Sequence, residues 1–213
     1  QIICILSGII FAIGNNNLIN KLLFLLSFIS INTYSFLVTN NFNYNTHLIF
    51  FLLLITFSNS TEYYSIPKNK FTPLNTNTII LYDRYCVGFS KLYIGFLYLQ
   101  AFLSKLINSG IEWFTSGDTI KTYILLRGTT LGKLFLSYPI SLKIFAGLTG
   151  VFELSFIFLL LFAKRDKLLG IAGILFHLSI FLLMEISFWF LWILFIPLFI
   201  MPKLNSCLVK KTK

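Results

Sequence analysis

Apolar residues occur in long runs separated by short polar stretches. The runs cover about residues 1–13, 18–39, 47–57, 85–107, 140–163 and 168–201. A helix needs ~20 apolar residues to cross a bilayer, and the stretches 85–107, 140–163 and 168–188 meet that length. The pattern predicts an all-α, polytopic transmembrane helical bundle with about six or seven membrane segments.

The ends of the chain have two special features. The run at 168–201 is long for one crossing and contains Pro197, which favours two short helices or a helix with a re-entrant piece. The first run begins at Gln1 without an initiating Met, so we expect the natural chain to extend further toward its N-terminus. No repeat or soluble domain is evident in the sequence, which predicts a single transmembrane domain over residues 1–213.

Two longer connections separate the apolar runs. Residues 58–84 are rich in Asn, Thr and Pro, which is typical of a polar linker. Residues 108–139 mix charges with apolar side chains such as Trp113, Phe114 and Tyr123, a pattern that predicts a helix lying at the membrane interface.

Composition supports a membrane location. The chain has 213 residues, of which 57% are hydrophobic, and a net charge of +10. Its basic residues stand at the ends of apolar runs, which favours positive-inside topology over nucleic-acid binding. This rule places the 164–167 loop in the cytoplasm and the 108–139 loop outside it, although Lys121, Arg127 and Lys133 oppose that orientation.

The cysteines and histidines predict neither disulfide bonds nor a metal site. The three cysteines, Cys4, Cys86 and Cys207, are odd in number and far apart, so they predict no disulfide framework. With only His47 and His177 in addition, we expect no metal site.

Ionisable residues inside apolar runs are costly, so Lys105, Glu153, His177 and Glu185 are candidate site residues. Glu153 and His177 each lie about ten residues, or ~15 Å, from the 164–167 loop, which puts them at one depth in an antiparallel hairpin. Small residues at Ala146 and Gly150 share the face of Glu153, so its carboxylate is expected to point inward. The predicted Glu153–His177 pair is either a structural clamp or a pair that handles protons or binds a ligand.

Lys105 and Glu185 are predicted near the outer boundary of the membrane, where they are able to pair. Simple snorkelling of Lys105 to the lipid headgroups is the alternative. Partial burial of Lys105 would make it a usable base. Lys91, near the cytoplasmic end of the same helix, is expected to snorkel.

Several short motifs resemble the HTTM (horizontally transferred transmembrane domain) family, a relative of the vitamin K-dependent gamma-carboxylases. The family pattern Y-x-x-A-G-x-x-K-L is similar to Tyr98 to Leu106, and its S-G-x-x-W and G-D-T-L pieces are similar to Ser109 to Trp113 and Gly117 to Thr119. The matching pieces that follow are Phe152-Glu153-Leu154 and Phe176-His177-Leu178 with Met184 and Phe188. The resemblance covers about residues 85–200.

The resemblance implies a helical membrane bundle. In the carboxylases, a lysine acts as the amine base in vitamin K oxidation, and Lys105 occupies the matching position. His177 and Glu153 match the family's histidine helix and acidic helix. Ser104 replaces a family lysine and Phe102 replaces a glycine, and no large extramembrane domain follows, so glutamate carboxylation itself is not expected.

Three functions follow from these observations. The first is a quinone-linked or peptide-modifying membrane enzyme that uses Lys105, His177 and Glu153 in catalysis and has a quinone or vitamin K-like molecule as its candidate cofactor. Its candidate substrate- or cofactor-binding residues are Trp113, Glu112, Asp118 and Glu185. The second is a non-catalytic integral subunit that binds lipid, quinone or the helices of other membrane chains. The third, a transporter or proton pathway, lacks the expected inverted repeat.

Overall fold

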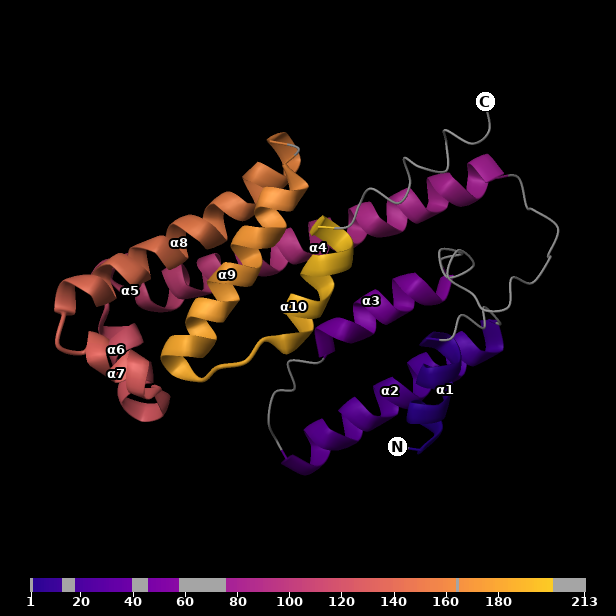
Figure 1. Ribbon diagram of the computed structural model, residues 1–213, viewed down its shortest axis with the longest axis horizontal. Helices are drawn as coiled ribbons and strands as arrows, with labels where there is room; N and C mark the ends of the chain where they lie inside the picture. The colour runs from indigo at the N-terminus through magenta and orange to yellow at the C-terminus, as the bar shows by residue number, and fades with distance from the viewer. Residues whose placement is uncertain (1, 13–17, 40–45, 58–75, 164, 201–213) are drawn as a thin grey trace. The chain divides into compact units, whose positions relative to one another are not determined.

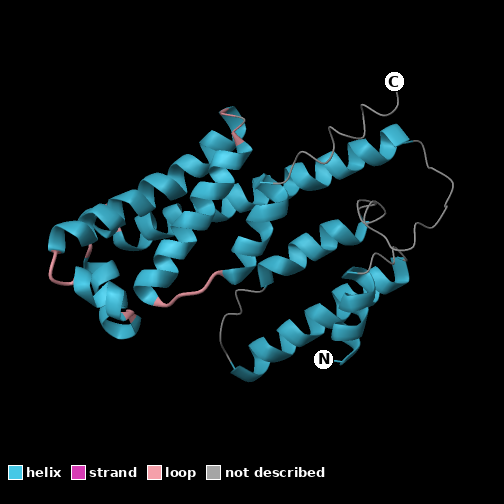
Figure 2. Cartoon of the chain, viewed as in Figure 1, coloured by secondary structure: helices cyan, strands magenta, loops and turns pink. Residues whose placement is uncertain are grey.

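The computed structural model describes residues 2–12, 18–39, 46–57, 76–163 and 165–200, and within these ranges the regular elements are all helices (Figure 2). The chain divides into two compact units, residues 1–90 and 91–213. Of the predicted linker at 58–84, residues 58–75 lie outside the described residues. Its last part, from Thr76, is helical rather than a loop. Apolar residues at 79–81 extend the following run, and Thr and Asn are typical at helix beginnings.

The first unit contains α1 (Ile2–Ala12), α2 (Leu18–Thr39), α3 (Thr46–Phe57) and the beginning of α4 (Thr76–Ser109). The helices α1, α2 and α3 coincide with the first three apolar runs of the sequence. Gly8 of α1 lies against the Phe24 ring of α2, because a Cβ at Gly8 would lie 2.9 Å from that ring. The Cys86 thiol of α4 lies 3.9 Å from the Leu54 carbonyl oxygen of α3.

The second unit contains the rest of α4, together with α8 (Pro139–Phe162) and α9 (Asp166–Met184). Figure 1 shows α8 and α9 side by side as a hairpin. Three stretches, Tyr85–Ser109, Pro139–Phe162 and Asp166–Met184, are long and apolar enough to cross a membrane. Their outward side chains include exposed Ile140, Leu148 and Val151, which water would not favour. The helices are those of a membrane-embedded protein.

The last apolar run is a helix followed by a returning piece. The chain breaks after α9 at residues 185–188, where Glu185 has a left-handed φ of 58°. It then forms α10 (Trp189–Phe195) and the π-helical turn η2 (Ile196–Ile200), which lie along α9 (Figure 1). Gly173 and Gly170 of α9 make room for the side chains of Phe195 and Phe199. Pro197 lies inside η2 and does not cause the break.

The 108–139 connection forms three short helices, α5 (Glu112–Thr115), α6 (Asp118–Arg127) and α7 (Thr130–Phe135), where the sequence predicted one. Gly117 separates the first two: its φ is 75°, and a Cβ there would lie 2.8 Å from the backbone of Leu142. The Thr129 side chain accepts a hydrogen bond from the Gly132 N–H and caps α7. Buried Ile120 and Ile124 pack with Leu142 and Ala146, which fixes α6 against α8.

Candidate functional site

An ion pair with a buried carboxylate joins α4 to α8. The Lys105 ammonium donates a hydrogen bond to Glu153 Oε1. The Glu153 side chain is 6% exposed and that of Lys105 is 23% exposed. Ala146 and Gly150 are also buried on the Glu153 face of α8, so the predicted inward direction of Glu153 is confirmed. The pair directs the Lys105 ammonium toward Glu153 of α8.

Trp113 covers the lysine. The Lys105 Nζ lies 4.8 Å from the centroid of the Trp113 ring, within the range of a cation–π interaction. Gly110, with a φ of 64°, ends α4 and turns the chain toward α5. The neighbouring Phe114 is buried at Gly150, where a Cβ would lie 2.5 Å from the Phe114 ring. The glycine therefore lets α5 approach α8 and place Trp113 beside the ion pair.

A second buried pair joins α4 to α9. The Tyr98 hydroxyl and His177 Nε2 are 2.6 Å apart, and both side chains are buried. Tyr98 precedes Lys105 by seven residues, or about two helical turns, so both side chains leave α4 on the same face. When the Tyr98 hydroxyl donates to Nε2, the Nδ1 atom carries the imidazole proton.

Aromatic rings enclose the second pair. The rings of Phe152 and Phe176 stack at 4.2 Å between α8 and α9, and Tyr98 meets the Phe152 ring edge-on at 5.2 Å. The rings of Phe188 and Phe195 lie 5.0 Å and 6.2 Å from the His177 ring. These apolar walls strengthen polar interactions inside them, because little solvent is present to screen charges.

The predicted direct pair of Glu153 with His177 is wrong. Glu153 bonds to Lys105, and His177 bonds to Tyr98. The helical rise gave the depth of each side chain but not its rotation about the helix axis. Among the described residues, Glu153 Oε2 and His177 Nδ1 are buried without a hydrogen-bond partner. Such atoms are costly in an apolar interior unless a polar group meets them.

The three other carboxylates predicted as site residues form no bond with the Lys105–Glu153 or Tyr98–His177 pair among the described residues. Glu112 and Asp118 are exposed, in the first turns of α5 and α6. Glu185 is exposed at the C-terminal end of α9, and Lys105 pairs with Glu153 rather than with it. The predicted binding roles of these three carboxylates, and of Trp113, stay predictions.

Lys91 forms an ion pair of its own. Its Nζ lies 2.5 Å from Asp166 Oδ2, in the first turn of α9, and 5.6 Å from the centroid of the Phe199 ring. This bond was not predicted from the sequence, although Lys91 and the 164–167 loop were predicted on one side of the membrane. The Tyr98–His177 bond was not predicted either, and the available signal for it was the seven-residue spacing from Tyr98 to Lys105.

Metal ligation receives no support from this arrangement. Among the described residues, no three His, Cys, Asp or Glu side chains lie close enough to hold a metal ion. Cys207 lies outside the described residues, and Cys4 and Cys86 form no disulfide within the part of the chain that the structure describes.

Comparison with known proteins assigns no relative. No protein-family model, no curated protein and no solved structure matches this chain.

Proposed function

We propose that this chain is an HTTM-like integral membrane protein that acts as a quinone-linked membrane enzyme, with Lys105, Glu153 and His177 as its proton-handling residues. One observation carries the proposal: two hydrogen-bonded pairs lie in the bundle, and each leaves one buried polar atom, Glu153 Oε2 or His177 Nδ1, without a partner among the described residues. A polar ligand that meets these atoms would remove the cost of their burial.

The ion pair offers a base. Lys105 and Glu153 share a hydrogen bond along which a proton can pass from the ammonium to the carboxylate, which leaves a neutral amine. The neutral Lys105 amine is a competent proton acceptor. Trp113 stabilises the ammonium that forms when Lys105 takes a proton.

A quinone head group fits the hydrogen-bonding capacity of the site. Glu153 Oε2 accepts a hydrogen bond from a hydroxyl, and His177 Nδ1 donates to a carbonyl or accepts from a hydroxyl, according to its tautomer. The Phe188 ring lies 5.0 Å from the His177 ring and supplies aromatic surface there. A bound quinone would supply oxidation–reduction chemistry, whereas the chain would bind it and manage protons. A peptide side chain is the other substrate class that fits a base at Lys105.

The HTTM relationship itself is part of the proposal. The resemblance rests on short motifs from four segments, and Tyr98, Lys105, Trp113, Glu153 and His177 come from those segments. Lys105 contacts both Glu153 and Trp113, and Tyr98 bonds to His177. Chance matches scattered along apolar helices have no reason to converge, so this convergence supports a common origin for the motifs. The HTTM-like core would cover residues 85–200.

The topology proposed with this function is multi-pass, with about six or seven membrane segments. The 164–167 loop is cytoplasmic and the 108–139 loop extracytoplasmic, with α5 to α7 lying at the outer interface. The Lys91–Asp166 bond supports one element of this arrangement, because it puts the early part of the α4 span and the 164–167 loop at the same end of the hairpin.

Quinone binding by the purified chain in nanodiscs tests the function. Menadione, a naphthoquinone without a long tail, is the probe, and equilibrium dialysis measures its binding. Wild type should bind it saturably, and Glu153→Gln and His177→Phe should each weaken binding by about tenfold, the value of one hydrogen bond of roughly 1.4 kcal/mol. Asp166→Asn is the matched control and should bind like wild type. Wild-type binding that does not saturate would overturn the quinone-linked function.

A non-catalytic integral subunit is the second candidate, and the closed Lys105–Glu153 pair favours it. A lysine whose charge is already neutralised inside the bundle is what a structural clamp between α4 and α8 requires. Purification of the chain in fixed stoichiometry with other membrane proteins, together with normal assembly of a Lys105→Met/Glu153→Leu variant, would select this function. A stable isolated chain would count against it.

A further inference from the structure

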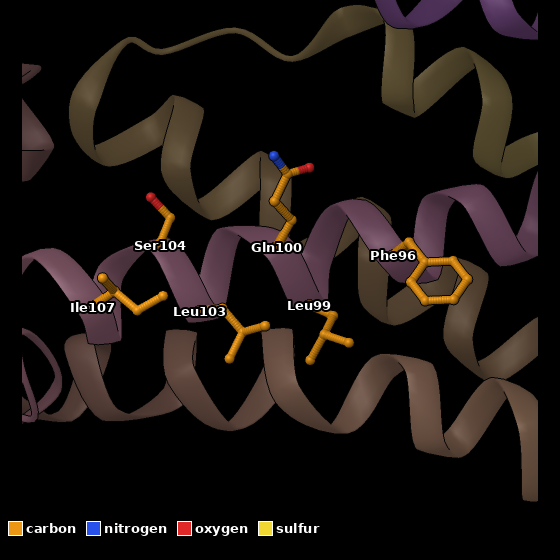
Figure 3. A pocket seen from close by; sticks show the side chains of 6 residues that line it. All are labelled: Phe96, Leu99, Gln100, Leu103, Ser104 and Ile107. Carbon is orange, nitrogen blue, oxygen red and sulfur yellow. The ribbon is translucent and has the colours of Figure 1, made fainter.

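The outer face of α4 carries a groove between two rows of side chains. One row has four-residue spacing and includes Phe96, Gln100 and Ser104, and the other contains Leu99, Leu103 and Ile107. These six residues line a cavity of about 430 Å³. Figure 3 shows Gln100 and Ser104 projecting to one side of the helix and Leu99 and Leu103 to the other. Rows of this spacing form the ridges and grooves by which helices pack together.

This groove is separate from the buried site. Successive residues of a helix are rotated by about 100°, so Gln100 points about 160° away from Tyr98 and about 140° away from Lys105. Tyr98 is buried, whereas Phe96, Leu103 and Ile107 are exposed at 59%, 42% and 79%. The inference drawn from the groove therefore does not rest on the proposed function.

The polar residues of the groove are out of place in lipid. Gln100 lies within the Tyr85–Ser109 span, is exposed, and its side chain makes no hydrogen bond within the part of the chain that the structure describes. One turn later, the Asn108 amide donates to the Ser104 hydroxyl at 3.2 Å, which extends the polar row. Hydrocarbon offers a carboxamide no partner, whereas a neighbouring helix with polar side chains does.

The chemistry of the row fits a second copy of the same chain. The row has no charged side chain, and each carboxamide carries both a donor and an acceptor. Two copies insert in the membrane with the same orientation, so a two-fold axis along the membrane normal brings Gln100 to Gln100 at equal depth. Such an axis makes an interface in which one surface meets itself. The reciprocal pair then satisfies both carboxamides at once.

We propose that two copies of this chain dock through the 96–107 face of α4, with Gln100 bonded to Gln100 and the apolar row of each helix packed in the groove of the other. The Lys105 site on the opposite face of α4 stays within each protomer.

Disulfide cross-linking in native membranes tests this docking. The native cysteines Cys4, Cys86 and Cys207 are first replaced by serine, and single cysteines are introduced as Gln100→Cys and Ser104→Cys. Oxidation with copper phenanthroline should give a band at twice the chain mass for both variants. Val151→Cys, on an equally exposed face of α8, is the matched control and should stay a single chain.

A second measurement gives the strength of the polar contact. Gln100→Leu should raise the dissociation constant of the dimer in detergent by roughly 3- to 15-fold, the range of membrane interhelical hydrogen bonds, while Leu99→Ile, which leaves the polar row intact, should change it less. Equal cross-linking at 100 and 151, a monomeric wild type, or cross-linked products with the mass of a different protein would each overturn the second-copy assignment.

Discussion

Two lysines of α4 meet two carboxylates of the α8–α9 hairpin in contrasting surroundings. Lys91 and Lys105 are fourteen residues, or ~21 Å, apart along the helix. Lys91 bonds to Asp166, whose side chain is 32% exposed in the first turn of α9. Lys105 bonds to Glu153, which is 6% exposed in the middle of α8.

This contrast indicates a structural role for the Lys91–Asp166 bond and a ligand-binding role for the Lys105–Glu153 pair. Asp166 has solvent, the N-terminal end of a helix and Lys91 to stabilise its charge, so the bond needs no further partner. Glu153 has neither solvent nor a helix terminus, and only one of its two oxygens is bonded among the described residues. A bond that leaves a buried oxygen unpartnered is poor as a pure clamp and useful as a ligand-binding group.

The largest effect is expected from breaking the buried pair on one side. Glu153→Leu leaves the Lys105 charge without its partner inside the bundle, and we expect a loss of about 3–5 kcal/mol in the free energy of unfolding. Lys105→Met/Glu153→Leu removes both charges and should recover most of that loss. Unfolding followed by circular dichroism in detergent measures both variants. Equal losses in the single and double variants would contradict a coupled pair.

The Tyr98–His177 bond should come next. Tyr98→Phe leaves His177 Nε2 buried without its 2.6 Å partner, which we expect to cost about 1–3 kcal/mol in unfolding free energy. The same unfolding experiment applies, with Tyr138→Phe, an exposed tyrosine of the same connection that carries Trp113, as the control. A cost no larger than that of the control would mean that the Tyr98–His177 hydrogen bond contributes nothing to the free energy of unfolding.

Gly150 lets the segment that carries Trp113 pack closely against α8, so a larger residue there should displace Trp113 from the ion pair. Gly150→Ala puts a Cβ 2.5 Å from the Phe114 ring, so we expect a loss of about 1–3 kcal/mol and a changed Trp113 fluorescence in a variant whose other tryptophans are replaced. Gly147→Ala is the matched control, since its Cβ would meet only the Phe114 carbonyl oxygen at 3.7 Å. Indistinguishable unfolding of the two alanine variants would refute the close approach at Gly150.

The smallest effect is expected at the Lys91 end. Asp166→Asn should cost less than Glu153→Leu, because the asparagine oxygen still accepts a hydrogen bond from Lys91 and water reaches position 166. Molar salt should weaken the wild-type Lys91–Asp166 bond and leave the buried pair almost unchanged. Thermal unfolding of wild type and Asp166→Asn at low and high salt measures this. A cost comparable to that of Glu153→Leu would contradict the proposed difference between the Lys91–Asp166 bond and the Lys105–Glu153 pair.

Features that depend only on position along the chain or along a helix axis could be predicted from the sequence. Apolar run length located α2, α8 and the start of α9 within a residue or two, and the small side chains at Ala146 and Gly150 gave the inward face of α8. The helical rise placed residues by depth, but the contacts of Glu153 depend on how α4 is rotated against α8. That rotation is set by tertiary packing.

Backbone breaks were harder to predict. The sequence pointed to Pro197, yet the chain reverses at 185–188, where Glu185 adopts a left-handed conformation that nothing local requires. The returning α10 explains this reversal, because Phe195 and Phe199 fill the space at Gly173 and Gly170. The same limit applies to Gly117, whose turn depends on the backbone of Leu142, twenty-five residues away.

The central claim is that a polar ligand binds at Glu153 Oε2 and His177 Nδ1. Nitrogen NMR of His177 tests this claim most directly. A His47→Gln variant without a histidine tag leaves His177 as the single labelled imidazole. Addition of menadione in nanodiscs should shift the Nδ1 resonance saturably, while Nε2 keeps the signature of its bond to Tyr98. An Nδ1 resonance that stays unchanged at saturating menadione would contradict the claim and leave the Lys105 end of α4 as a structural clamp.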